Sequence, residues 1–215
     1  MSARIERVGS LLLAATALYL AVLRPWHMTW GATGAESEGP VPGDELMPDA
    51  DIVSTRAVEI DAPPWAVWPW LVQMGPGRGG AYTYDWIERR LGIDIHNVDR
   101  VVPELQGLRV GDEIPLPGYA MRVERLDRER AMVIRSTNDA WVWAFELRPV
   151  GERRTRLISR NRIDRSGWTA RDWLGYPLME PGSWVMERKM LLTIAERAED
   201  LAREGAAASF GRDAA

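Results

Sequence analysis

The sequence predicts an α+β fold in which a curved antiparallel β-sheet packs against one long C-terminal α-helix. Two observations predict this fold. Short segments rich in β-branched and aromatic residues follow one another between residues 110 and 163, and a helical apolar stripe occupies residues 183–203. A single amphipathic helix on one face of an antiparallel sheet is a two-layer arrangement that buries both apolar faces.

The composition excludes several kinds of site. The chain has 215 residues and a net charge of −4, so its overall charge gives no indication of a nucleic-acid surface. Cysteine is absent, which excludes disulfides and thiolate chemistry, and the only histidines are His27 and His96. We therefore expect no metal, no cofactor and no nucleic-acid partner.

The first element is an apolar run of sixteen uncharged residues, Val8–Leu23. As a helix it spans roughly 24 Å, slightly less than a hydrocarbon core of about 30 Å, and Trp26 and Trp30 could extend it at the headgroup level. We predict a single membrane anchor in residues 1–26. A cleaved signal peptide and a helix packed on the domain are the alternatives. Two arginines before the run and one after it favour a domain outside the cytoplasm.

Residues 27–51 are predicted to form an acidic connection. Between Gly31 and Asp51 there are six acidic residues, three prolines and no basic residue, a pattern typical of an extended surface segment. The domain itself is predicted at 52–204, followed by a flexible Ala/Gly-rich tail at 205–215.

Inside the domain, local patterns give the order of the elements. A strand at 52–61 leads into two prolines and a short helix at 65–73 that Pro69 interrupts. A glycine-rich turn (75–80), a second short helix (84–91) and a long loop (93–108) follow. Strands are then predicted at 110–116, 120–126, 131–135, 140–148 and 155–163.

The fourth of these five strands alternates clearly. Trp141, Trp143, Phe145 and Leu147 point to one face and the residues between them to the other, so one face is buried. After an irregular stretch at 166–182, the last helix is predicted to begin at a Ser183 cap, with Glu187 near its first turn.

Several segments together resemble a known family. They are 24–27 (RPWH), 30–33 (WGAT), 55–63 (TRAVEIDAP), 67–75 (VWPWLVQMG), 78–86 (RGGAYTYDW), 94–97 (DIHN), 180–182 (EPG) and 186–190 (MERKM). The chain resembles a bacterial subgroup of the START-like or SRPBCC superfamily, which includes the polyketide cyclase/dehydrase branch and the birch-pollen-allergen fold. The resemblance covers roughly residues 24–203. It implies a helix-grip fold with a ligand pocket between the sheet and the last helix.

The candidate ligand-binding residues are aromatic, Met and Arg side chains. Aromatic rings and Met supply flat or adaptable apolar surface, and Arg suits a carboxylate or phosphate, although a plain core uses the same apolar residues. The set is Met74, Arg78, Tyr82, Tyr84, Trp86, Trp141, Trp143, Met186 and Met190. The function expected is the binding, transport or sequestration of a hydrophobic or amphipathic small molecule or lipid at a membrane.

Two other functions remain open. In the first, the protein is a polyketide cyclase- or dehydrase-like enzyme in which His96, oriented by Asp85, transfers protons; a loop-organising role of His96 is the alternative reading. In the second, the protein is a membrane-tethered interaction module without a ligand. The match of residues 75–80 to G-x-G-x-x-G lacks the strand–helix context of a dinucleotide site, and a turn or pocket lid is expected there instead.

Arg160 and Arg162 share one face of the last strand with Ile158. The sequence leaves three environments open for both arginines: solvent, the cavity, or ion pairs with the acidic connection.

Overall fold

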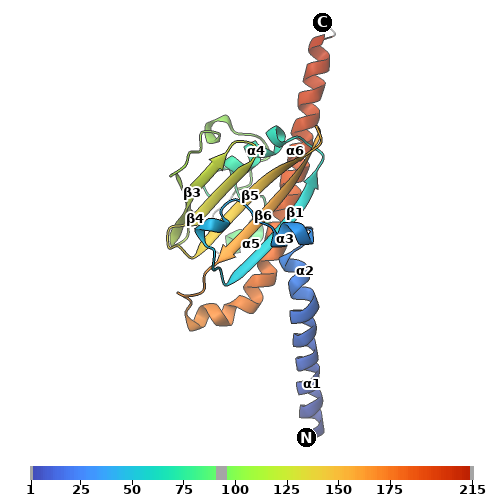
Figure 1. Ribbon diagram of the computed structural model, residues 1–215, viewed down its shortest axis with the longest axis vertical. Coiled ribbons are helices and arrows are strands. Elements are labelled where there is room, and N and C mark those ends of the chain that lie inside the picture. The colour runs from blue at the N-terminus through green and yellow to red at the C-terminus, as the bar shows by residue number, and fades with distance from the viewer. Residues whose placement is uncertain (1, 91–95, 214–215) are drawn as a thin grey trace.

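A six-stranded antiparallel sheet forms the centre of the molecule (Figure 1). The computed structural model describes residues 2–90 and 96–213. The strand order is β1-β6-β5-β4-β3-β2. The strands are β1 (Ile52–Ile60), β2 (Glu113–Leu116), β3 (Tyr119–Asp127), β4 (Ala131–Ser136), β5 (Trp141–Val150) and β6 (Arg154–Ile163). These bounds confirm the predicted strands, with β2 beginning three residues later than expected.

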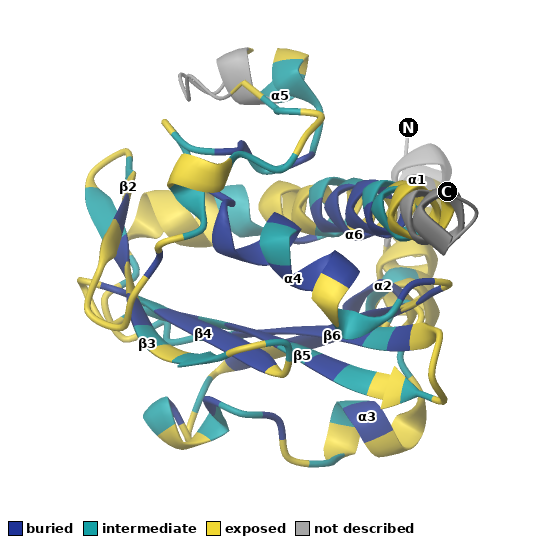
Figure 2. Ribbon diagram, turned by 90° about the horizontal axis from the view of Figure 1, so that it is seen from above, coloured by how far each residue is buried: buried dark blue, intermediate teal, exposed yellow. Residues whose placement is uncertain are grey.

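The long helices cover one face of this sheet, and a short helix lies on the other. They are α1 (Ser2–Leu18), a π-helical turn η1 (Tyr19–Leu23), α2 (Arg24–Met28), α3 (Gly34–Glu38), α4 (Pro64–Val72), α5 (Asp85–Arg90) and α6 (Ala170–Asp213), with 3₁₀ turns η2 (Asp44–Leu46) and η3 (Pro103–Leu105). Figure 2 shows α4 and α6 on the inner face, with α5 beyond them, and α3 on the outer face. The predicted helix-grip arrangement of a sheet and a long C-terminal helix is therefore observed.

The register assigns each side chain to a face. Arg56 lies opposite Ser159 and Trp143 lies opposite Asn161, so these four side chains all point to the inner face. A shift of register between Val123 and Arg125 marks a β-bulge in β3.

Each face of the sheet carries a buried core. The inner core is built from apolar residues of the sheet, α4 and α6, including Ile60, Leu71, Phe145, Leu157, Met190, Leu191 and Ile194, none more than 1% exposed. A smaller outer core joins the sheet to the segment 31–51; it contains Val41, Met47, Ala57, Val133, Val142, Ala144 and Ile158. Segment 31–51 therefore packs on the domain, and we call it the outer strap.

The N-terminal helix projects away from the domain. α1, η1 and α2 follow one another as a rod that leaves the lower end of the domain in Figure 1. Leu11 and Leu13 are 70% and 74% exposed, so this part of the rod is not packed on the domain. The segment Gly9–Met28 is long and apolar enough to cross a membrane, a property that it shares with signal sequences and with core helices of soluble proteins.

The last helix is much longer than the sequence predicts. α6 begins at Ala170, so the expectation of irregular structure at 166–182 and of a helix start at Ser183 is wrong. The Ser183 hydroxyl instead donates to the Glu180 carbonyl, 2.8 Å away, inside the helix. Pro177 and Pro181 lie within α6, and Figure 1 shows the helix bending between its first turns and its main part.

A cap explains the early start. Both the backbone N–H and the hydroxyl of Thr169 donate to the Asp172 carboxylate, at 2.7 and 2.6 Å. This satisfies groups at the helix N-terminus that would otherwise be unpaired. At its other end α6 continues to Asp213, through most of the predicted tail. The predicted boundaries after residues 26, 51 and 204, which separate the N-terminal helix, the acidic connection, the domain and the tail, stay predictions.

Candidate functional site

The inner face of β5 carries a row of stacked aromatic side chains. Trp141, Trp143 and Phe145, which we call the aromatic row, have ring centroids 5.2 Å and 4.8 Å apart. Strand alternation brings them to one face, as the sequence predicts. The row provides a continuous flat apolar surface between the sheet and α6.

The aromatic row is fully buried at Phe145 but only partly buried towards the beginning of β5. Phe145 is fully buried, whereas Trp143 and Trp141 are only half-buried although they belong to the same inner face. Tyr119 of β3 is also half-buried, and desolvation by its surroundings raises the pKa of its hydroxyl. The inner face is therefore incompletely covered where β5 begins.

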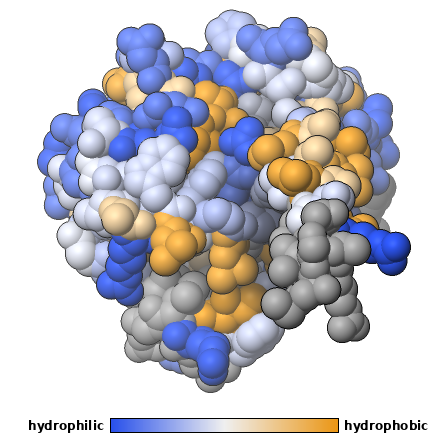
Figure 3. Space-filling view, turned by 90° about the horizontal axis from the view of Figure 1, so that it is seen from below, coloured by the Kyte–Doolittle hydropathy of each residue, from blue (hydrophilic) through white to orange (hydrophobic). Residues whose placement is uncertain are grey.

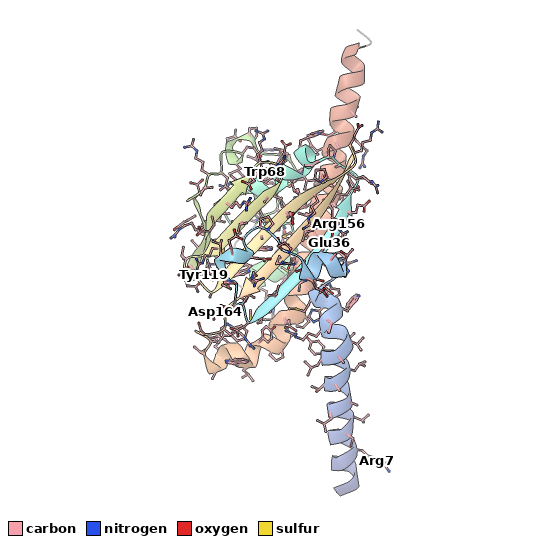
Figure 4. All side chains as sticks on the ribbon, viewed as in Figure 1. Arg7, Glu36, Trp68, Tyr119, Arg156 and Asp164 are labelled. Carbon is pink, nitrogen blue, oxygen red and sulfur yellow. The ribbon has the colours of Figure 1, made fainter. Side chains whose placement is uncertain are left out.

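This uncovered end is the end from which α1 projects. Tyr119 is labelled at the lower end of the sheet in Figure 4, and Trp68 at the opposite end. The backbone N–H of Trp141 donates to the Ser136 hydroxyl at 2.9 Å, and Ser136 pairs with Met121 of β3, which places Trp141 at the same lower end as Tyr119. The face seen from below in Figure 3 shows apolar side chains at this end of the molecule.

The indole N–H groups of the row have internal partners. Trp143 Nε1 donates to the Ser159 hydroxyl at 2.8 Å, and Trp141 Nε1 donates to Asn161 Oδ1 at 2.9 Å. Because these donors are satisfied, the flat faces of both rings can contact an apolar molecule without leaving a buried polar group unpaired.

A buried ion pair lies beneath these contacts. The Arg56 guanidinium pairs with the Glu187 carboxylate, and their side chains are 1% and 7% exposed. Glu187 also accepts from the Ser159 hydroxyl at 2.7 Å and from Asn161 Nδ2 at 3.0 Å. Neither Arg56 nor Glu187 was among the predicted site residues. The predicted place of Glu187 near a helix start is wrong because α6 begins at Ala170, which puts Glu187 in the middle of the helix.

The ion pair also reaches the N-terminal rod. Arg56 Nε donates to the His27 carbonyl at 3.0 Å. A second buried carboxylate, Glu180 of α6, accepts from the Tyr19 hydroxyl and from Arg24 Nε, both at 3.0 Å. α6 thus connects the inner face of the sheet to the base of the N-terminal helix through two carboxylates.

The glycine-rich turn is held inside the domain. Gly75 and Gly80 pair as an isolated bridge with φ values of 125° and 89°, a region that favours glycine. Arg78 Nη2 donates to the carbonyls of Val72 and Leu105, at 2.9 and 3.0 Å. Those bonds give Arg78 a role in joining the turn to η3.

Tyr82 is a core residue with a left-handed backbone. It is 1% exposed, its φ is 58°, and its hydroxyl donates to the Trp70 carbonyl at 3.0 Å. Desolvation raises the pKa of this hydroxyl to about 12. The Arg197 guanidinium lies 4.8 Å from the Tyr82 ring centroid and 5.4 Å from that of Trp70, so the ring forms part of the α4–α6 contact.

Asn97 connects its own loop, which contains His96, to the segment 82–85, which contains Asp85. Its Oδ1 accepts from the Tyr82 backbone N–H at 2.5 Å, and its Nδ2 donates to the Thr83 carbonyl at 3.2 Å and to the Asp85 carboxylate. His96 is exposed at the surface beside it. Asn97 entered the prediction only as part of the segment 94–97 that carries the family resemblance. Asp94, in the same motif, lies outside the described residues.

The other predicted ligand residues lie in different environments. Met74 and Met190 are buried in the inner core, at 4% and 1% exposure. Tyr84 and Met186 are half-buried, and Trp86 of α5 is 64% exposed. Of the predicted set, Met74, Tyr82 and Met190 belong to the inner core, and Trp141 and Trp143 pack against it.

Arg160 and Arg162 bind the outer strap. The Arg160 side chain is 3% exposed and its Nη1 lies 2.6 Å from the Asp44 carboxylate, while Arg162 Nη1 lies 3.2 Å from the other oxygen of that group. Arg156 of the same strand pairs with Glu36 at 2.8 Å, and Figure 4 shows these two side chains beside α3. Of the three environments left open by the sequence, the acidic segment is the one observed.

The chain was compared with protein families, curated sequences and solved structures, and only solved structures are similar to it. No protein-family model and no curated protein sequence matches it. Among solved structures, the Polyketide_cyc-like protein Cgl2372 from Corynebacterium glutamicum is 15% identical, with a TM-score of 0.34, and the match covers 70% of this chain and 89% of that chain. Protein NE0264 from Nitrosomonas europaea is 15% identical, with a TM-score of 0.43 and coverage of 74% and 99%. CalU16 from Micromonospora echinospora is 16% identical, with a TM-score of 0.33 and coverage of 70% and 86%.

Proposed function

We propose that this protein is a membrane-tethered domain that binds a hydrophobic or amphipathic molecule on the inner face of its sheet. The observation that carries the proposal is the gradient of burial along the aromatic row, from the fully buried Phe145 to the half-buried Trp143 and Trp141. Large rings that are left partly exposed on a face otherwise covered by helices are suited to contact an apolar ligand.

The chemistry of this end favours an amphipathic ligand. The flat faces of Trp141 and Trp143 offer apolar contact, and each Å² of apolar surface buried contributes about 25 cal/mol. The half-buried hydroxyl of Tyr119 can donate to a polar group of the ligand. Arg78 and the Tyr82 hydroxyl are already bonded to backbone carbonyls, so they are weaker candidates for this role.

The tether supports the same proposal. The apolar segment Gly9–Met28 leaves the domain from the end where the aromatic row is exposed. A lipophilic molecule is most concentrated in the bilayer, so a binding surface next to the membrane can take up its ligand without transfer through water.

Native mass spectrometry tests the proposal on the full chain, released from its own host's membranes in a mild detergent. We expect a co-purified lipophilic molecule that is lost from the double variant Trp141→Leu/Trp143→Leu. The matched control is Trp65→Leu, which replaces a tryptophan that is 45% exposed on α4. An empty wild-type protein, or a molecule retained equally by both variants, would contradict the proposal.

A further inference from the structure

A second exposed apolar surface lies on the first turns of α6. Within the described residues, Leu174 and Leu178 have the highest exposed fractions of any large hydrophobic side chains, 84% and 81%, and Trp173 is 51% exposed. The two leucines are four residues apart in a helix and therefore lie on one side. Trp173 precedes Leu174 in the sequence, and its ring centroid lies 5.3 Å from that of Trp168. We call the segment 165–179 the α6 foot.

The α6 foot has a fixed position relative to the N-terminal rod. Glu180, which directly follows the foot, is 5% exposed and accepts hydrogen bonds from Tyr19 and Arg24 at 3.0 Å. In Figure 1 the foot runs across the lower end of the domain, beside the point where the rod emerges, and at a large angle to α1. A flat surface crossed by α1 would therefore meet the foot along its length.

The chemistry of the foot is typical of a membrane interface. The Arg165 guanidinium lies 4.8 Å from the Trp173 ring centroid and 5.9 Å from that of Trp168, and Arg171 is exposed. Trp and Arg are frequent at the headgroup level, where one part of the side chain is apolar and the other is hydrated. Exposed leucines beside them would enter the boundary between headgroups and acyl chains.

We propose that the α6 foot lies in the headgroup layer of a lipid bilayer, with Trp173, Leu174 and Leu178 directed into the acyl boundary. Interfacial helices of this kind lie about 5–10 Å into that boundary. The proposal rests on the membrane tether of the proposed function and adds a second, separate contact with the same bilayer. This contact fixes the orientation of the domain, so that the aromatic row faces the membrane.

Site-directed labelling tests the contact, because the chain contains no cysteine. Single variants Leu178→Cys, Leu13→Cys and Arg128→Cys are labelled with an environment-sensitive fluorophore. The full chain is then reconstituted in vesicles of phosphatidylcholine and phosphatidylglycerol. Leu13 reports the rod, and Arg128, in the turn between β3 and β4, reports the opposite end of the sheet. Nitroxides attached to lipid headgroups, or deep in the acyl chains, serve as quenchers.

The inference predicts that the probe at position 178 shifts to the blue and is quenched most by headgroup and shallow nitroxides, while the probe at 128 is not quenched. Position 13 is expected to be quenched most by deep nitroxides. Quenching at 13 without quenching at 178 overturns the foot contact and leaves the tether standing. Quenching at 178 without quenching at 13 supports the foot and contradicts the tether. A blue-shifted probe at 178 that no lipid nitroxide quenches indicates a protein partner and overturns the inference.

A second variant separates this contact from effects on folding. Leu174→Asp places a charge at a position that is 84% exposed, so the fold is expected to be unaffected, and circular dichroism checks this. In this background we expect the quenching at 178 to be lost while the quenching at 13 remains. Unchanged quenching at 178 contradicts a role for the leucine face.

Discussion

At the scale of single residues, the buried pair of Arg56 and Glu187 is the most sensitive point of the site. Removing one partner leaves the other charge buried and uncompensated, because both side chains are almost fully buried. We predict that Glu187→Ala lowers the free energy of unfolding by about 3–5 kcal/mol, measured by chemical denaturation of the full chain in detergent.

Two control variants accompany this prediction. The double variant Arg56→Met/Glu187→Leu removes both charges and is expected to recover most of the loss. Arg122→Ala breaks the exposed pair with Glu113, in which both side chains are 49% exposed, and is expected to cost less than about 1 kcal/mol. A cost of Glu187→Ala no larger than that of Arg122→Ala would contradict the assigned network.

The second residue-scale prediction concerns Asn97 and His96. Asn97 satisfies the Tyr82 backbone N–H and holds Asp85, so Asn97→Ala is expected to cost about 1–3 kcal/mol in the free energy of unfolding. His96 is exposed, and His96→Ala is expected to change stability by less than about 0.5 kcal/mol. Thermal unfolding of both variants measures these changes in stability. A loss of stability for His96→Ala larger than that for Asn97→Ala would assign the loop-organising role to the imidazole.

The sequence reveals some of these residues and not others. Alternation along β5 places Trp141 and Trp143 on one face without any structure, because successive side chains of a strand point to opposite sides. The pairing of Arg56 with Glu187 joins residues 131 positions apart, and no local pattern carries such a contact. One local signal was available: Arg56 lies in the middle of a predicted strand, within the run 54–58 that is buried in the structure, and a charge in such a position requires a partner.

At the scale of elements, the outer strap depends on Asp44. This carboxylate pairs with the buried Arg160 and with Arg162, so Asp44→Ala leaves a buried guanidinium without its counter-charge. We predict a loss of about 1–3 kcal/mol in the free energy of unfolding and faster proteolysis within residues 31–51. Glu38→Ala, an exposed acid of the same strap, is the control and is expected to cleave like the wild type.

The strap also predicts a dependence of stability on pH. The hydrogen bond from Arg156 is the largest cause that lowers the pKa of Glu36, from 4.5 to about 2. Between these values the unfolded chain binds more protons, so this contribution to stability is complete above about pH 5 and is lost as the pH falls towards 2. Glu36→Gln is expected to flatten the acid limb of a stability profile; an unchanged limb would contradict the pairing.

The bounds of an element could be predicted where local periodicity determines them. They could not be predicted where long-range contacts determine them. The six strands follow from local patterns of β-branched and aromatic residues bounded by turns. The early start of α6 could not be predicted from local patterns, because Pro177, Pro181 and two glycines are typical helix breakers when the sequence is considered alone. The Thr169–Asp172 spacing is a capping signature that could have placed this start.

At the scale of the whole molecule, three features meet at one end. The N-terminal rod and the α6 foot lie at the lower end of the sheet in Figure 1. The bond from Trp141 to Ser136 and the pairing of Ser136 with Met121 place the uncovered part of the aromatic row at the same end. Two buried carboxylates of α6, Glu180 and Glu187, connect this end to the rod and to the sheet. If the proposed function holds, this arrangement presents the binding surface to the bilayer that the N-terminal rod enters.

The most direct test of this account is photo-cross-linking of the membrane-reconstituted full chain with a diazirine-bearing fatty acid, followed by mapping of the labelled peptides. The account predicts labels on β5 at Trp141 and Trp143 and on β3 at Tyr119, in addition to lipid-facing labels on α1. An excess of unlabelled fatty acid is expected to remove the labels on β5 and β3 and to leave those on α1. Labels confined to α1, or equally spread over the surface, would contradict a binding surface on the inner face of the sheet.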